Sequence, residues 1–242
     1  MRYLIVSCAI VGLTLAIGCS TTTEVEDPSP WTIDNIHTLI IDPATTGEMH
    51  NQFLDIMFRD KEDPQPEFAR EAFIAAFEEL FQEYDLSATV IAEMIDQFTP
   101  AFNGLVDTHA ITFPRGSIQD PSVATDYIMG IGAFTESDRT ALLGFLTDLA
   151  NAEKGADALI NISEAWITAQ ACEGITIAAS IMSSSASYWA DKHEPATGDQ
   201  VVIADVIGGI VGWWVNPGLG SIIGAGIGSY MATTYMSDVG DH

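Results

Sequence analysis

The chain has 242 residues, with 34 Asp and Glu against eight Lys and Arg, which gives a formal net charge of −26. This charge argues against nucleic acid as a partner, because an acidic surface repels phosphates, and against unassisted adsorption to anionic lipid. Hydrophobic residues make up 48% of the chain, which is consistent with one good core. We interpret the acidity first as an adaptation to salt, which screens self-repulsion, and second as a cation-binding surface.

The first 18 residues predict an export signal. Met1 and Arg2 supply a short positive start, residues 3–17 are almost wholly apolar, and no other charge occurs before Glu24. A run of this length is typical of a signal peptide and is short for a membrane span, which needs about 20 apolar residues.

A cysteine follows this apolar run directly. The sequence "AIGC", residues 16–19, resembles the lipobox of bacterial lipoproteins, in which a small residue precedes the cysteine that is lipidated and becomes the new N-terminus. Ala16 stands where leucine is usual, with Leu15 one place earlier. The resemblance implies lipidation of Cys19, and Ser20 after it favours the outer membrane or cell surface. An ordinary secretory signal that happens to contain a cysteine is the alternative.

Removal of the export signal also removes Cys8 and Arg2. The formal net charge then changes from −26 to −27, and lipidation of Cys19 leaves Cys172 as the one remaining cysteine, so no intramolecular disulfide can form. Five segments are expected along the chain: a signal peptide at 1–18, an acidic tether rich in Pro and Thr at 19–34, a helical domain at 35–199, a glycine-zipper hairpin at 200–236 and a tail at 237–242.

Hydrophobic periodicity predicts an all-α, multi-helix bundle. Asp42 is a plausible N-cap before Pro43, and Ser87 is another, whereas Pro100 is expected to end the helix that Ser87 begins. Residues 100–120 hold two prolines and two glycines and predict a loop. The expected helices of the first 152 residues cover 43–58, 66–84, 88–99, 121–131 and 137–152.

A long segment at 157–192 is low in charge and is interrupted only by Gly174. If it were one helix it would extend about 50 Å at 1.5 Å per residue. We therefore expect a central helix that the others wrap. Alternation with period two is nowhere long enough to predict a sheet, and no internal repeat is apparent.

The segment 201–236 differs from the rest of the chain, because Asp205 is its one charged residue and glycines recur in it every four residues. The preceding sequence "EPATGDQ" predicts a break, and Asn216-Pro217-Gly218 predicts a turn between two antiparallel helices. Glycine costs up to about 1 kcal/mol per helical position, so these helices require close backbone packing. The glycines expected to make that packing are Gly208, Gly212, Gly220, Gly224 and Gly228.

This hairpin is similar to the glycine-zipper hairpins of several bacterial surface lipoproteins and of some membrane-active bacteriocins. The resemblance implies a packing device, without an activity, and leaves open whether the hairpin lies in a protein core or in a bilayer. The first arm, 206–215, reaches only about 15 Å as a helix and the second, 219–236, about 27 Å, against a hydrocarbon core of about 30 Å. We therefore expect packing at least partly against protein.

Catalytic and metal-binding patterns are not recognisable in the chain. None of His37, His50 and His109 has the spacing of a metal motif, so each is interpreted as a surface or capping residue. Cys172 is interpreted as a small core residue. No GxSxG motif, phosphate loop or dinucleotide fingerprint occurs. The sequence thus predicts no enzyme activity, no cofactor and no metal.

Three classes of function stay open. The leading hypothesis is a lipid-anchored envelope protein with a structural or interaction role, held to the membrane by its N-terminal lipid, with an unidentified protein partner or a second copy of itself. The alternative is a membrane-active protein, pore-forming or bacteriocin-like, whose hairpin enters a bilayer. A cell-surface hydrolase requires acids such as Glu93, Asp96 and Asp107 to converge, and a pocket with two carboxylates of raised pKa would indicate it.

Overall fold

The computed structural model describes residues 30–39, 41–59, 70–112, 117–132, 134–190 and 195–239, except for the side chains of 195–198 and 234–239. These ranges are almost entirely helical, so the predicted all-α, multi-helix bundle is confirmed. The expected signal peptide and residues 19–29 of the expected tether lie outside the described residues, as do residues 240–242 of the tail.

The described residues form helices and short strands in the following order along the chain. The helices are α1 (Pro43–Phe58), α2 (Arg70–Leu80), α3 (Ala88–Asp107), α4 (Pro121–Met129), α5 (Glu136–Ala150), α6 (Ala156–Ala169), α7 (Glu173–Ala190), α8 (Pro195–Val215) and α9 (Leu219–Val239). Two 3-10 turns, η1 (Ile36–Thr38) and η2 (Gln82–Tyr84), accompany them. Two short strands, β1 (Ile111–Thr112) and β2 (Ser117–Ile118), pair antiparallel, with Ile111 opposite Ile118.

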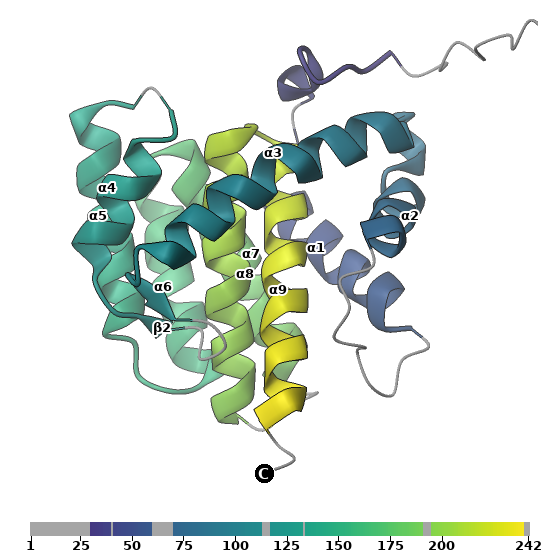
Figure 1. Ribbon diagram of the computed structural model, residues 1–242. Helices are drawn as coiled ribbons and strands as arrows, with labels where there is room; N and C mark the ends of the chain where they lie inside the picture. Colours follow the sequence, from purple (N-terminus) through teal and green to yellow (C-terminus); the bar gives the residue numbers. More distant parts are fainter. Residues whose placement is uncertain are drawn as a thin grey trace, which may run out of the picture.

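The hairpin of α8 and α9 occupies the middle of the molecule. Figure 1 shows this pair with α4, α5 and α6 on one side, α1 and α2 on the other, and α3 crossing in front. α7 packs against α1, α6 and α8. Every residue from 219 to 230 is buried, so this part of α9 has no face exposed to solvent. The most apolar helices of the chain are therefore its centre, and the amphipathic helices form the layer around them.

The expected central helix over 157–192 is wrong, because two helices replace it. α6 ends at Ala169, Gln170 adopts a left-handed conformation with φ of 46°, and α7 begins at Glu173. The two helices pack side by side, and the Ser163 hydroxyl of α6 donates to the Ala179 carbonyl of α7 at 2.6 Å. A long apolar segment is compatible with one long helix or two shorter ones, and packing against neighbours selects the second here.

The expected end of a helix at Pro100 is also wrong, because α3 continues through this residue to Asp107. Pro100 has no N–H to donate to the Asp96 carbonyl four residues earlier, but both residues are exposed, so water can satisfy that carbonyl. On the opposite side, Phe102 and Leu105 are buried. Burial of two such side chains contributes about 1.5–3 kcal/mol each, which offsets the cost of a proline inside a helix.

The predicted N-caps of α1 and α3, Asp42 and Ser87, are confirmed. The Asp42 carboxylate accepts hydrogen bonds from the backbone N–H groups of Ala44 and Thr45, both at 3.1 Å. The Ser87 hydroxyl accepts from the Val90 N–H at 3.3 Å. Each cap satisfies N–H groups that have no partner inside the helix.

The segment before α1 packs on the hairpin end of the bundle. The Trp31 indole N–H donates to the Tyr84 carbonyl at 2.7 Å, and Ile36 is fully buried. The Leu39 carbonyl lies so close to the hairpin turn that a Cβ on Gly218 would be 3.0 Å from it. Residues 31–34, which the expected tether includes, therefore already belong to the folded body.

Candidate functional site

The two central helices touch through their glycines. A Cβ on Gly208 would overlap the Gly224 carbonyl, whose carbon would lie 2.7 Å away. A Cβ on Gly212 would overlap the Gly220 carbonyl, and one on Gly228 would overlap the carbonyl opposite it in α8. The structure thus brings together all five glycines that the sequence singled out, in one antiparallel register.

The hairpin turn lies where it was expected, but the first arm is longer than expected. Gly218 has φ of 89°, a conformation that favours glycine, and the Asn216 N–H donates to the Gly212 carbonyl at 2.8 Å. α7 ends at Ala190 and α8 begins at Pro195, so a break separates the two helices, but residues 195–200 of the predicted breaker "EPATGDQ" are already helical. A proline at the first position of a helix needs no N–H partner and is compatible with this start. Across the part of the chain that the structure describes, no helix has both the length and the apolar character to cross a membrane.

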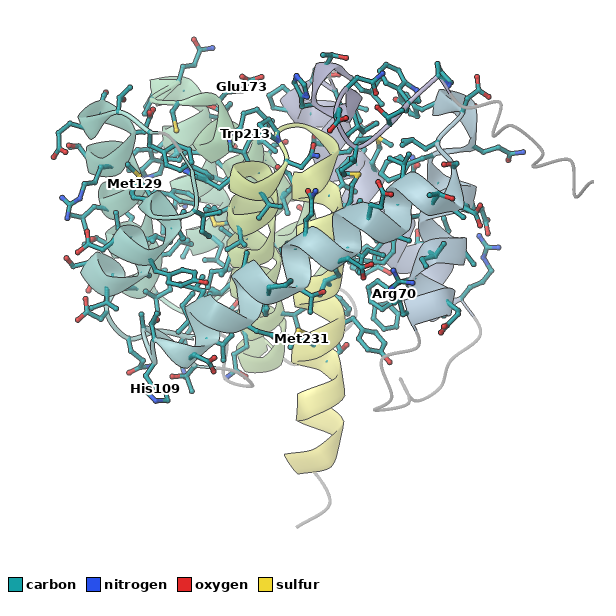
Figure 2. All side chains as sticks on the ribbon, turned by 45° about the horizontal axis from the view of Figure 1, so that its top comes forward. Arg70, His109, Met129, Glu173, Trp213 and Met231 are labelled. Atoms are coloured by element: carbon teal, nitrogen blue, oxygen red, sulfur yellow. The ribbon has the colours of Figure 1, made fainter. Side chains whose placement is uncertain are left out.

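The outer faces of the hairpin are covered by protein. Side chains of the surrounding helices reach the hairpin glycines. A Cβ placed on Gly224 would be 2.8 Å from the Phe98 ring of α3, and a Cβ placed on Gly209 would be 2.9 Å from Ile181 of α7. Gly226 faces the ring of Phe53 in α1. At the turn, Trp213 packs on the beginning of α7, and Figure 2 shows it beside Glu173. The hairpin therefore packs against protein, as the sequence predicted.

One charged side chain lies inside this apolar centre. Asp205 of α8 is fully buried and accepts hydrogen bonds from the hydroxyls of Ser185 in α7 and Ser229 in α9, and from the Trp189 indole N–H at 3.4 Å. His50 of α1, also fully buried, places its Nε2 3.6 Å from the Asp205 Oδ2. Four helices therefore converge on one carboxyl group. We call these five residues the polar node.

The ionisation of the node is shifted by its burial. Burial raises the pKa of Asp205 to about 8, although the hydrogen bonds from Ser185, Ser229 and Trp189 act in the opposite direction. Burial lowers the pKa of His50 to about 4, opposed by the Asn51 side chain 3.3 Å from Nδ1. The Nε2 atom of His50 has no hydrogen-bond partner among the described residues. Between pH 4 and 8 the pair thus holds one proton and has no net charge.

Sequence reasoning missed this node, and the surface or capping role expected for His50 is wrong. His50 lies three residues before Phe53 and four before Leu54, on the apolar face of α1 that packs against α7 and α9. That position, together with the lone charge of Asp205 in an apolar run, was the available signal. His37 and His109, by contrast, are exposed as expected.

Cys172 lies in the turn before α7 and is only half-buried. The small core position expected for it is therefore not what the structure shows. Burial still raises the pKa of its thiol, which disfavours the reactive thiolate.

The node is not arranged for nucleophilic catalysis. The hydroxyls of Ser185 and Ser229 both donate to Asp205, and His50 activates neither of them. The side chains of Ser185, Asp205 and Ser229 are inaccessible to solvent, and so is the side chain of His50. A substrate therefore has no approach to these groups in this conformation.

The acids considered for a hydrolase do not converge. Glu93 and Asp107 are exposed at different places along α3, and Asp96 pairs with Arg70 at 2.7 Å. Within the described ranges, no group of three His, Cys, Asp or Glu side chains is placed to hold a metal ion. A surface hollow of about 440 Å³ includes Glu153, Asp157 and Asp199, but the Asp199 carboxylate there caps α6 by accepting the Gly155 N–H at 2.8 Å.

The fold and the node together define an all-α bundle built around a glycine-packed hairpin with one buried histidine–aspartate pair. No protein-family model, curated protein or solved structure matches this chain.

The acidic surface leads to a prediction about salt. Arg59 and Arg70 each pair with an acid at an exposed position, and such pairs contribute little to stability. The chain has eight Lys and Arg for its 34 acids, so repulsion between the acids dominates. Raising NaCl from low to molar concentration should raise Tm by several degrees, measured by calorimetry, with an uncharged osmolyte as the control. A flat or falling Tm would contradict an adaptation to salt.

Proposed function

We propose that this protein is an exported, lipid-anchored envelope protein whose helical domain has a structural or interaction role and catalyses no reaction. The observation that carries the proposal is the enclosure of the apolar hairpin. Among the described residues, Val123 is the one large hydrophobic side chain classed as exposed, at 41%. The folded body thus offers little apolar surface to a bilayer, and a lipid on Cys19 would supply the attachment instead.

The position of the N-terminal segment fits this arrangement. Trp31, where packing begins, is twelve positions after Cys19, and a fully extended chain of twelve steps spans about 40 Å. Trp31, near the end of the bundle where the hairpin turns, would therefore stay within about 40 Å of the lipid surface. Ser20 after the lipidated cysteine favours the outer membrane or cell surface.

The acidic surface restricts the partner. A net charge of −27 after processing repels nucleic acid and favours a partner with a cationic face. The interaction role thus proposed is with a basic protein surface, or with a second copy of this chain where cations screen the charge.

The anchor is tested by replacing Cys19 with serine. We expect the variant to incorporate no labelled fatty acid and to leave the membrane fraction, because no helix among the described residues has the length and apolar character to span a bilayer. Cys172→Ser is the matched control and should keep both label and membrane attachment. Persistence of the label in Cys19→Ser would refute the assignment.

The membrane-active alternative is separated by the same variant. With the hairpin enclosed, Cys19→Ser protein should stay soluble without detergent and should release no dye from anionic or neutral vesicles. If it binds those vesicles and makes them leak, the hairpin enters bilayers and the alternative replaces our proposal.

A further inference from the structure

The polar node combines two buried ionisable side chains with the contacts of four helices. Of the described Asp, Glu, His, Lys and Arg side chains, His50 and Asp205 alone are buried. We propose that the node is a pH-sensitive latch: while the carboxyl group of Asp205 carries a proton beside neutral His50, it holds the α8–α9 hairpin against α1 and α7, and it lets the hairpin loosen when that proton is lost.

The hydrogen bonds of the node place the latch where the hairpin meets its neighbours. Asp205 is bound from α7 by Ser185 and Trp189 and from the other hairpin arm by Ser229. His50 reaches the same carboxyl from α1. Separation of α1 or α7 from the hairpin must therefore break the contacts of Asp205 and expose it to water.

No further described titratable group faces this carboxyl. Asp199, on α8 itself, accepts the Gly155 N–H, and Asp55 of α1 accepts from Tyr188 of α7. Tyr230, next to Ser229, packs edge-on against the ring of Phe73, with 4.9 Å between centroids. The protonation of the node is thus governed by His50 and Asp205.

Counting protons gives the direction of the response. In the closed node, one proton keeps the pair neutral, since an isolated charge is costly in an apolar interior. In an open node both groups meet water, and at pH 7 to 8 an ordinary aspartate and histidine together hold almost no proton. Opening therefore releases a proton in this range, so rising pH favours the open state.

The pKa shifts set the window. The folded pKa of Asp205, about 8, exceeds the ordinary 3.8. The contribution of this group to the stability of the folded state is therefore fully present below pH 3.8 and is lost as the pH rises to 8. The folded pKa of His50, about 4, is below the ordinary 6.5. The contribution of His50 to the stability of the folded state is therefore present above pH 6.5 and is lost as the pH falls to 4. Between about pH 4 and 6.5 the contribution of His50 rises with pH as fast as that of Asp205 falls, so the two changes cancel. From pH 6.5 to 8 only the loss of the Asp205 contribution remains.

Two variants separate these contributions. In Asp205→Asn, the amide keeps the shape without the proton, so the remaining His50 should give stability that rises from pH 4 to 6.5 and is constant above. In His50→Gln, the remaining Asp205 should give stability that falls across the whole range from pH 4 to 8. The wild-type protein should be level to about 6.5 and then fall.

The experiment is hydrogen exchange of α8 and α9 amides in the full mature chain, expressed as protection factors and thus corrected for the intrinsic pH dependence of exchange. From pH 6.5 to 8.0 we expect protection to fall by up to about 30-fold in the wild-type protein and in His50→Gln, and to stay constant in Asp205→Asn. From pH 5.0 to 6.5, protection should fall in His50→Gln relative to the wild-type protein.

Constant wild-type protection from pH 6.5 to 8.0 would overturn the latch, as would an equal loss in Asp205→Asn. If Asp205→Asn does not fold at pH 6, as judged by circular dichroism, the comparison of His50→Gln with the wild-type protein from pH 5.0 to 6.5 decides alone. The measurement needs no membrane, so its failure would leave the proposed lipid anchor untouched.

Discussion

Replacing Gly208 with alanine is expected to lower the free energy of unfolding by about 3 kcal/mol, because overpacking at a fixed contact is costly. The added Cβ would meet the carbonyl of Gly224, which is backbone and cannot move aside alone. Alanine has the higher helix propensity by about 1 kcal/mol, so propensity predicts the opposite sign. The two helices must separate, and with them the contacts that surround the hairpin. Urea denaturation measures the loss.

The neighbouring Gly209 supplies a matched control on the same helix. A Cβ there would meet the terminal Cδ1 of Ile181 at 2.9 Å, and backbone no closer than 3.6 Å. A flexible methyl group can shift, so Gly209→Ala should change stability by less than about 1 kcal/mol. Equal costs at the two positions would mean that the glycine contacts between the arms do not hold the hairpin. Gly224→Leu, with a larger side chain at the same contact and Phe98 on its other side, should prevent folding.

Sequence pattern predicted those features of the fold that neighbouring residues decide. The N-caps Asp42 and Ser87 act on N–H groups within three residues, so their effect does not depend on the rest of the molecule. The turn at Asn216–Gly218 is likewise local, and the spacing of Gly208 and Gly212 places both on one face of a helix. These predictions needed no knowledge of what packs where.

The features that were missed depend on packing between distant segments. α3 continues through Pro100 because Phe102 and Leu105 are buried beyond it. α8 begins inside the apparent break, at Pro195, and leads directly into the buried Val201 and Val202. Periodicity alone carries no information on either environment. Helix boundaries are therefore where local signals are overridden most often.

The polar node was out of reach for the same reason. His50 and Asp205 are far apart in the sequence, and neither lies in a recognisable motif. Their meeting requires α1 and α8 both to pack against α7 and α9, which only the assembled bundle provides. What the sequence offered was a histidine on an apolar helical face and a single acid in an apolar segment. Each is ordinary alone and becomes informative as a pair.

A chain that ends at Asp199 should not fold, because it lacks the centre of the bundle. Loss of α9 and nearly all of α8 would expose Phe53, Phe98 and Ile181 at once, and each such side chain loses about 1.5–3 kcal/mol of burial. Their sum exceeds the margin of about 5–15 kcal/mol by which a domain is stable once the other contacts of the hairpin are included. We expect low helix content by circular dichroism and no cooperative melting, measured in the Cys19→Ser background so that the lipid does not complicate solubility.

The matched control is a chain that ends at Met236. It keeps residues 219–232, which include the buried part of α9, and it should retain the helix content and the cooperative melting of the full protein. This pair of truncations decides what the hairpin is. If the chain ending at Asp199 still melted cooperatively with native-like helix content, the surrounding helices would form a domain by themselves and the hairpin would be an appendage free to leave it. The enclosure of the hairpin, on which the proposed function rests, would then have no energetic basis, and the membrane-active alternative would be favoured.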